Sequence, residues 1–430
     1  MHVDPLSDCI SDHSSPNSWG YFRSFRQGET MLTEADLRAA EALTTVQPAW
    51  TGLSTAEDAL QLRPHTLLHC GPPVEPSHAL VQPILNSAAV ACVFEGWAAD
   101  LDEALLLVRS GSIRFLPAQD HLVATPMAAV VSPSMRMIEM TDLGDTTRRC
   151  YAPINGGGHG GSPVPRYGRR APECVEFLRF LNGEVADLLE GISAEPLQWL
   201  PIIDHALIGG DDTHLRHVAA HARLIGTFDL RQSTTASHAD ANAFVREWPF
   251  LHLNFWMAAV RCVLDGASGV PSSSLVTAFG GNGDTFGLQV SGLPGRWFTV
   301  EATPPLGKLR GGFIAADTTG AFGDSAVIEA FGLGALAHRY APQMRELFAG
   351  HRHHDLLSLP SKLLATEHPG LPQSGARVGL VARNVTARRA TPVVELGIVD
   401  RKGEAGGLGA GLYRPPLEPF ASACAALDGA

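Results

Sequence analysis

The sequence lacks any cysteine pattern that indicates disulfides or a zinc site. Its seven cysteines are odd in number and widely spaced, and no Cys-x-x-Cys motif occurs. This usage is typical of reduced thiols in the cytosol. No uninterrupted apolar run approaches the ~20 residues of a membrane span, and the first twenty residues lack the basic and apolar regions of a secretory signal. We therefore expect a cytoplasmic protein without a membrane partner.

Positive charge is also scarce. Lys and Arg number 32 against 44 Asp and Glu, so the formal net charge is −12. This balance argues against a general nucleic-acid binder, but it allows a small anionic substrate, which needs only a local positive site. Hydrophobic residues make up 45% of the 430 residues. That content is ample for buried cores and, at this length, for two or three domains.

The order of helix and strand patterns divides the chain into four parts. Residues 1–30 are polar and Ser-rich, which predicts a mobile segment. Residues 31–172 alternate between helix and strand patterns, residues 173–266 have mainly helical spacing, and residues 267–430 return to strands and Gly-rich turns. The predicted fold class is α/β (α+β), with two mixed α/β domains and a mainly helical insert domain between them.

Local signals predict individual elements in the first of these domains. Thr33 and Asp36 form a capping-box pattern at the start of a helix, and Asp100 precedes a second helix as a predicted N-cap. The apolar run at 88–94 is short and continuous, which favours a buried strand.

The most unusual feature is a glycine-dense block from Ser272 to Pro305, followed by a second block from Gly320 to Ala337. Glycine there is interleaved with apolar residues, which indicates folded backbone rather than a flexible linker. Successive N–H groups from Gly280 to Gly283 could bind an anion, although the lysine of a P-loop is missing. Arg296 could bind a carboxylate or phosphate, and a surface salt bridge is its alternative role.

The second glycine block also contains a predicted helix start. Asp324 or Ser325 would be the N-cap, and the N-terminus of such a helix favours anions. Glu329 lies one turn further along. The alternative reading makes Asp324 only a cap and Glu329 only a surface acid.

Histidines supply candidates for proton transfer and for metal binding. Asp120 and His121 follow a predicted strand and could act as acid and base, or they could form an exposed polar turn. His214, His217 and His221 are spaced to share one face of a predicted helix that Asp211 or Asp212 would cap. A straight helix spreads the three rings over two turns, and the His-Glu-x-x-His motif is absent, so no metal site is predicted.

Several segments resemble those of a single known family. The clearest are FGLQVSGLPGRWFT, AFGDSAVIEAFGLGALA and GGLGAGLYRPPLEPF, and PMAAVVSPSM and GDDTHLRHVAA precede them in the family's order. The chain thus resembles the YlbE/AllG-like family, long classed as a domain of unknown function, over nearly all of its length beyond residue 30. His214 and Arg216 match the family pattern, whereas Ala118–His121 stands where the family has Cys-His-His-His.

The resemblance implies carbamoyl transfer between oxalurate and phosphate, giving oxamate and carbamoyl phosphate. It also implies an FdrA-like partner subunit, and we expect a homo-oligomer that uses no cofactor. The favoured function is a carbamoyl- or acyl-transfer enzyme or subunit acting on a small carboxylate or amide. Two alternatives stay open: an amide-forming, cyclising or hydrolytic enzyme of specialised metabolism, and a non-catalytic structural subunit.

The candidate site residues fall into two groups. The expected catalytic residues are His121, Asp120, His214 and Glu329. The expected substrate- or anion-binding residues are Ser134, Asp211, Asn282, Gly283, Arg296, Asp324 and Ser325.

Overall fold

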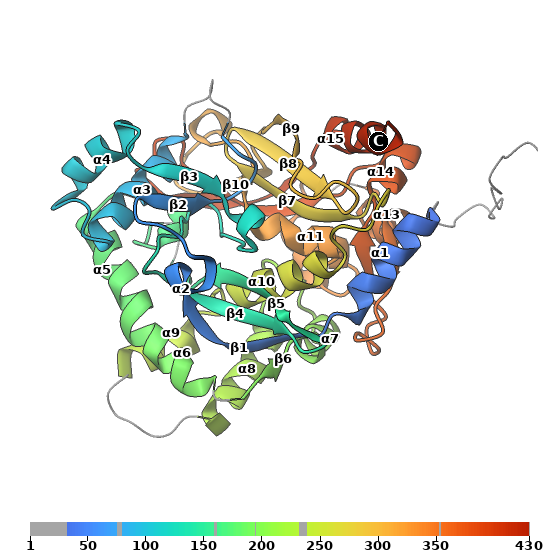
Figure 1. The fold of residues 1–430 in the computed structure, drawn as a ribbon, viewed down its shortest axis with the longest axis horizontal. Coiled ribbons are helices and arrows are strands. Elements are labelled where there is room, and N and C mark those ends of the chain that lie inside the picture. The colour runs from blue at the N-terminus through green and yellow to red at the C-terminus, as the bar shows by residue number, and fades with distance from the viewer. Residues whose placement is uncertain are drawn as a thin grey trace, which may run out of the picture.

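The protein is described by a computed structural model that covers residues 32–74, 80–158, 161–193, 195–231, 239–351 and 354–429. The N-terminal segment predicted to be mobile lies outside the described residues. The described chain has a mixed α/β fold in which two antiparallel sheets lie on either side of a helical layer (Figure 1).

The first of these sheets has the strand order β5-β4-β1-β6. Its strands are β1 (Pro48–Thr55), β4 (Arg136–Asp142), β5 (Asp145–Pro153) and β6 (Leu197–Gln198). The second sheet has the order β11-β7-β8-β9. Its strands are β7 (Val276–Asn282), β8 (Thr285–Val290), β9 (Phe298–Glu301) and β11 (Phe322–Gly323). All strand pairs in both sheets are antiparallel.

Three smaller sheets complete the β structure. An antiparallel one consists of β10 (Leu306–Leu309), β15 (Gly407–Tyr413) and β14 (Val394–Val399), in that order. An antiparallel pair joins β12 (Leu364–Glu367) and β13 (Arg377–Leu380), and a parallel pair joins β2 (Thr66–His69) and β3 (Arg114–Pro117).

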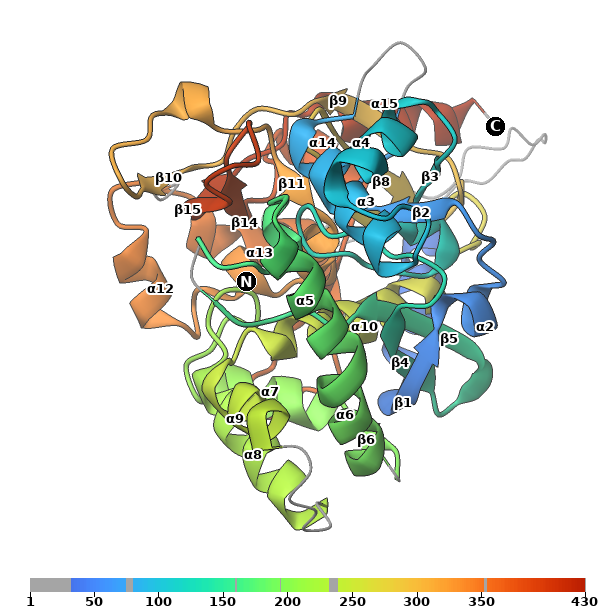
Figure 2. The same ribbon diagram turned by 90° about the vertical axis from the view of Figure 1, so that its left-hand side faces the viewer.

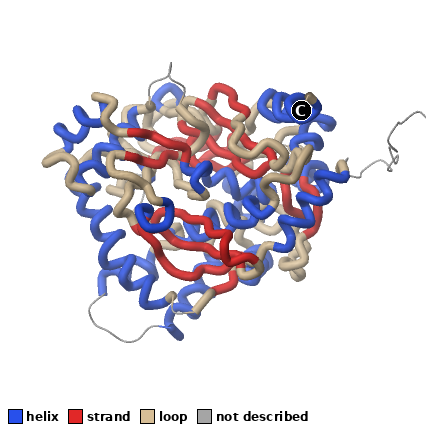
Figure 3. The backbone as a smooth tube through the Cα atoms, viewed as in Figure 1, coloured by secondary structure: helices blue, strands red, loops and turns tan. Residues whose placement is uncertain are grey.

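Helix α10 (Leu251–Gly266) is the centre of the molecule. Its residues from Leu251 to Leu264 are all buried, as expected for a helix that is covered on every side. It contacts β1, β4 and β5 of the first sheet, β7 of the second sheet, and α11 (Val327–Phe331). Figure 3 shows the same arrangement, with strands above and below a band of helices.

The remaining helices surround this core. On the side of Figure 2 where α5 faces the viewer, α5 (Pro172–Phe180) continues through a π-helical turn into α6 (Ala186–Ile192), with α8 (Val218–Arg231) and α9 (Ala239–Glu247) nearby. The others are α1 (Glu34–Thr45), α2 (Ala56–Leu60), α3 (Gln82–Phe94), α4 (Leu101–Arg109), α7 (Leu200–Ile208), α12 (Pro342–Leu347), α13 (Leu359–Leu363), α14 (Ala382–Arg388) and α15 (Glu418–Asp428). Among the described residues, no helix is both long and apolar enough to cross a membrane.

The capping predictions at Thr33 and Asp100 are confirmed, whereas the N-cap predicted at Asp324 or Ser325 is wrong, because these residues lie inside the 3₁₀ turn Asp324–Ala326 and no side chain caps it or α11. The Thr33 hydroxyl accepts a hydrogen bond from the Asp36 N–H, and the Asp36 carboxylate accepts one from the Thr33 N–H. Asp100 caps α4 through the N–H groups of Asp102 and Glu103. The mainly helical character of 173–266 is confirmed as well, although the domain boundaries at 172 and 266 stay predictions.

The strand prediction for residues 88–94 is wrong, because they form the second half of α3. Pro83 occupies the first turn of this helix, where proline is tolerated. Three alanines in the run favour a helix. Since α3 is buried around most of its circumference, its sequence has no polar stripe, and a short apolar run of this kind cannot be told from a strand.

Candidate functional site

A cavity of about 400 Å³ opens beside the β10-β15-β14 sheet. This volume lies within the range of small-molecule sites. Segments far apart in the sequence form its wall, including the loop after β5, the loop before α8, and the strands β10 and β15. Its lining includes Arg166, His214, Lys308, Arg310 and Ser325, and no acidic residue among the described part of the chain. The lining is therefore electropositive in a protein whose net charge is −12.

Arg166 is the buried cation of this cavity, with only 7% of the residue exposed. Its guanidinium donates hydrogen bonds to Asn155 Oδ1, Gly157 O and the Tyr167 hydroxyl. All three acceptors are neutral, and no carboxylate of the described residues forms an ion pair with Arg166. Burial lowers the pKa of Arg166, with partial compensation from Tyr167, but an arginine stays charged in proteins. An uncompensated buried cation favours an anionic ligand.

His214 and Glu329 form a buried pair at the cavity wall. His214 Nδ1 donates to Glu329 Oε1 at 2.9 Å and lies 3.1 Å from Oε2. Glu329 Oε1 also accepts hydrogen bonds from the N–H groups of Ala335 and Glu395. Since Glu329 holds Nδ1, Nε2 is the ring nitrogen left for a ligand in the cavity.

The charge state of His214 follows from this pairing. Burial lowers its pKa, but the charge and hydrogen bond of Glu329, together with Glu395 and Asp212, outweigh burial and leave the pKa raised. A protonated imidazole next to a cavity can donate a proton to a bound substrate.

Glycine at position 334 allows the close approach of Glu329. Gly334 has a φ of +58°, and a Cβ there would overlap Glu329 Oε1 and come within 3.2 Å of His214 Cβ. The tight turn after α11 thus requires glycine, both for its backbone conformation and for space.

The prediction that three histidines share a helix face is wrong, because α8 begins only at Val218. His214 and His217 lie in the preceding loop, where Asp212 Oδ1 accepts hydrogen bonds from three successive N–H groups. His217 is instead fixed by hydrogen bonds from Trp256 Nε1 and to His214 O, and burial lowers its pKa to about 3.

Of the residues expected to be catalytic, His214 and Glu329 are brought together, whereas Asp120 and His121 are not part of the cavity lining. Asp120 Oδ1 accepts hydrogen bonds from Gln289 Nε2 and Trp297 Nε1. The two pairs therefore offer distinct candidates for proton transfer.

The residues expected to bind anions lie at several places. Ser325 lines the cavity. Asp211 caps α8 by accepting from the N–H groups of Val218 and Ala220. Ser134 is exposed and donates to Glu95 Oε1.

The glycine block is engaged in sheet structure. Gly280 and Gly281 of β7 pair with β8, and Asn282 of β7 pairs with β11. Gly283, with a φ of +88°, donates its N–H to Ala321 O. The Asn282 carboxamide accepts from the N–H groups of Asp284 and Thr285 and so holds the β7–β8 turn. Arg296 is exposed and stacks over the Phe298 ring, 5.0 Å from its centroid.

Sequence reasoning missed Arg166, Lys308 and Arg310 in the cavity and the buried side chains of His338 and Glu395 behind it. The signals for most of these were weak, because each residue comes from a different segment. Glu395 did carry one, since a lone acid inside an apolar strand is unusual unless it is paired.

Comparison with known proteins agrees with this architecture. A family profile for oxamate carbamoyltransferase subunit AllG matches residues 113–325. The oxamate carbamoyltransferase subunit AllG of Escherichia coli K12 is 29% identical over 422 residues, covering 94% of this chain and 98% of that protein. The uncharacterized protein YahG of the same organism is 28% identical over 415 residues, covering 91% and 85%.

A solved structure supports the fold. The crystal structure of a conserved protein of unknown function from Enterococcus faecalis V583 matches with a TM-score of 0.84 and 25% identity, covering 92% of this chain and 97% of that one. Taken with the sequence matches over more than nine-tenths of the chain, this likeness makes the protein a distant homologue of AllG and of YahG.

Proposed function

We propose that the cavity is the active site of a carbamoyl- or acyl-transfer enzyme, or of the catalytic subunit of one, that acts on small anions. The observation that carries the proposal is the buried Arg166 guanidinium, which faces a ligand-sized cavity without an acidic partner among the described residues. A guanidinium binds carboxylate and phosphate oxygens well. Lys308 and Arg310 add positive charge to the same wall.

The His214–Glu329 pair would supply the proton transfer. In carbamoyl transfer from oxalurate to hydrogen phosphate, a phosphate oxygen attacks the carbamoyl carbon and the C–N bond to the oxamate nitrogen breaks. The leaving nitrogen needs one proton, and the attacking phosphate loses one. Protonated His214 would give its Nε2 proton to the nitrogen and regain a proton from the phosphate, so the step balances. Glu329 would hold the imidazole in position and stabilise its charge.

The relation to AllG supports oxalurate as the first substrate to test. Purified protein, alone and with a candidate FdrA-like partner, should form carbamoyl phosphate from oxalurate and phosphate. His214→Gln should lower kcat by roughly 10²–10⁴-fold, the usual contribution of a general acid–base group. Melting temperatures of all variants would show whether each one folds.

His121→Gln is the matched control, because it removes a histidine that lies outside the cavity lining. We expect it to keep most of the activity. A His214→Gln variant with the kcat of wild type, or a folded His121→Gln variant without activity, would show that the reaction does not take place in this cavity. No turnover and no binding of oxamate or phosphate, even with partners present, would favour a non-catalytic subunit.

A further inference from the structure

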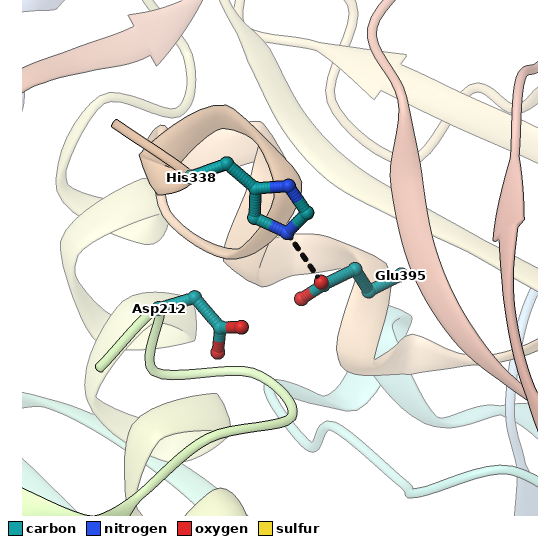
Figure 4. A group of neighbouring side chains, drawn as sticks. All are labelled: Asp212, His338 and Glu395. Carbon is teal, nitrogen blue, oxygen red and sulfur yellow. Dashed lines mark hydrogen bonds and ion pairs between the residues drawn. The ribbon is translucent and has the colours of Figure 1, made fainter. Parts of the chain in front are cut away.

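A second group of ionisable side chains lies behind the His214–Glu329 pair. Asp212 comes from the loop before α8, His338 follows the 3₁₀ turn η7 (Gly334–Ala337), and Glu395 lies in β14. All three are buried. Figure 4 shows the two carboxylates turned toward each other and the imidazole of His338 directed at Glu395. We call these three residues the Asp212 cluster.

The spacing of the Asp212 cluster suits a single small cation. One ligand atom from each residue lies within 4.8 Å of the other two, and His338 Nε2 is 2.6 Å from Glu395 Oε1. Nitrogen and oxygen ligands bind a zinc-sized ion at about 2.1 Å, so two ligands of a tetrahedral site lie roughly 3.4 Å apart. Binding would therefore open the His338–Glu395 hydrogen bond and draw the more distant ligand atoms together, each by roughly an ångström.

Two buried oxygens of the cluster have no hydrogen-bond partner among the described residues. Asp212 Oδ1 accepts three backbone N–H groups, but Asp212 Oδ2 accepts none, and Glu395 Oε2 is likewise unpartnered. A buried carboxylate oxygen without a donor or cation is costly. Both oxygens belong to the carboxylates that face each other in Figure 4.

Charge within the described residues does not compensate this pair. Glu395 forms an ion pair with His338, and no lysine or arginine in the described part of the chain forms one with Asp212. The imidazole of His214 is hydrogen-bonded to Glu329 instead. Burial raises the pKa of Asp212 to about 7 and that of Glu395 to about 8, so without a cation the two carboxylates share a proton, and a divalent ion would take the place of that proton.

We propose that Asp212, His338 and Glu395 bind a first-row divalent metal ion of the zinc or manganese class. Two carboxylates and one imidazole are a borderline ligand set that suits these ions. Calcium prefers six to eight oxygen ligands, and magnesium keeps several waters, so a buried site with one nitrogen ligand fits neither.

The metal would position the catalytic pair. The Glu395 N–H donates to Glu329 Oε1, and Asp212 Oδ1 accepts from the His214 N–H. The Gly334 N–H donates to Asp212 O. An ion that ties Asp212 to Glu395 would therefore hold His214 through its backbone N–H and Glu329 through its carboxylate, without touching the substrate.

The test is the metal content of the full-length protein, purified without chelators from cells supplied with zinc, manganese and iron. We expect about one ion per chain by mass spectrometry. Removing it with a chelator should lower the melting temperature, and adding Zn²⁺ or Mn²⁺ should restore it. Glu395→Gln keeps the size of the side chain and should lower the metal content at least tenfold.

Asp204→Asn is the matched control, because Asp204 is a buried carboxylate outside the cluster that binds the N–H groups of Gln373 and Ser374. It should keep the metal even if it is less stable. The proposal would be overturned if wild-type protein contained no stoichiometric metal and its melting temperature changed with neither chelator nor added ions. Asp212 and Glu395 would then be a carboxyl–carboxylate pair that shares a proton. Equal metal content in wild type and Glu395→Gln would overturn the assignment of the site, whatever the activity shows about the cavity.

Discussion

Asp324 is a fully buried carboxylate that joins three segments of the chain. Its oxygens accept hydrogen bonds from the Gly71 N–H, the Gln119 carboxamide, and both the N–H and the hydroxyl of Thr125. It also places the neighbouring Ser325 at the cavity wall. At the residue scale, this carboxylate is therefore a structural anchor for the cavity.

The protonation of Asp324 makes the stability of the protein depend on pH. Burial raises its pKa to about 6, against the hydrogen bonds that favour the charged form. Between pH 3.8, the ordinary pKa of the group, and about pH 6, the folded state thus keeps a proton on Asp324 that the unfolded chain has released. This contribution to stability grows as the pH falls through 6, and above 6 the charged form carries the full cost of burial.

Replacing the carboxylate should remove this dependence. The unfolding free energy of wild type minus that of Asp324→Asn should increase by on the order of 3 kcal/mol as the pH is lowered from about 7.5 to about 4. Cys70, whose pKa burial and the charge of Asp324 raise well above 9, stays neutral in this window. Denaturant titrations at several pH values measure the difference, and a constant difference would contradict the assignment.

At the scale of the element, α1 is held to the core by its own capping residue. Asp36 Oδ2 completes the capping box with Thr33, and Asp36 Oδ1 accepts from the Ser274 N–H and from the hydroxyls of Ser273 and Ser274. One carboxylate therefore serves both the helix start and the segment that leads into β7.

This double role predicts a large effect of Asp36→Ala. We expect a loss of about 3 kcal/mol of unfolding free energy, because the change removes a cap and leaves buried donors without an acceptor. Asp58 is the matched control, since it has the same place relative to Thr55 at the start of α2 but is exposed. Asp58→Ala should cost about 1 kcal/mol or less. Equal losses in urea unfolding would show that the remote contacts of Asp36 contribute little.

Elements with local signals could be predicted from the sequence, and elements without them could not. The caps at Thr33 and Asp100 depend on residues three positions apart, so they were visible. Helix α3 lacks polar residues because it is buried on most sides, and its period is hidden. The loop from Asp212 to His217 carries helical spacing, but Thr213 has a φ of +68°, outside the helical region, and Asp211 caps the helix that begins at Val218.

At the scale of the whole molecule, the candidate site could be predicted only in part. The sequence indicates His214 and Glu329 only separately, through helix-start signals and the family resemblance. Their contact, 115 positions apart, depends on packing that no local pattern encodes. The same holds for Arg166, whose loop reads only as a Gly- and Pro-rich boundary.

The cavity draws its cations from distant parts of the chain, so a bound anion should stabilise the whole fold. Arg166 follows β5, His214 precedes α8, and Lys308 and Arg310 belong to the β10 region. A ligand that binds only the folded state at a hundred times its Kd adds about 2.7 kcal/mol, which is a rise of a few degrees in Tm for a chain of this size. We expect phosphate or oxamate to produce this rise, and sodium chloride at equal ionic strength not to produce it.

Two arginine variants test where the anion binds. Arg166→Gln should abolish most of the rise in Tm, because it removes the buried guanidinium. Arg296→Gln should keep it, since Arg296 is exposed and stacks on Phe298 rather than lining the cavity. The opposite result, in which Arg296→Gln loses the rise in Tm and Arg166→Gln keeps it, would place the anion at the glycine-dense block. The pair of variants thus decides between the cavity and the β8–β9 turn by a measurement that needs no knowledge of the reaction.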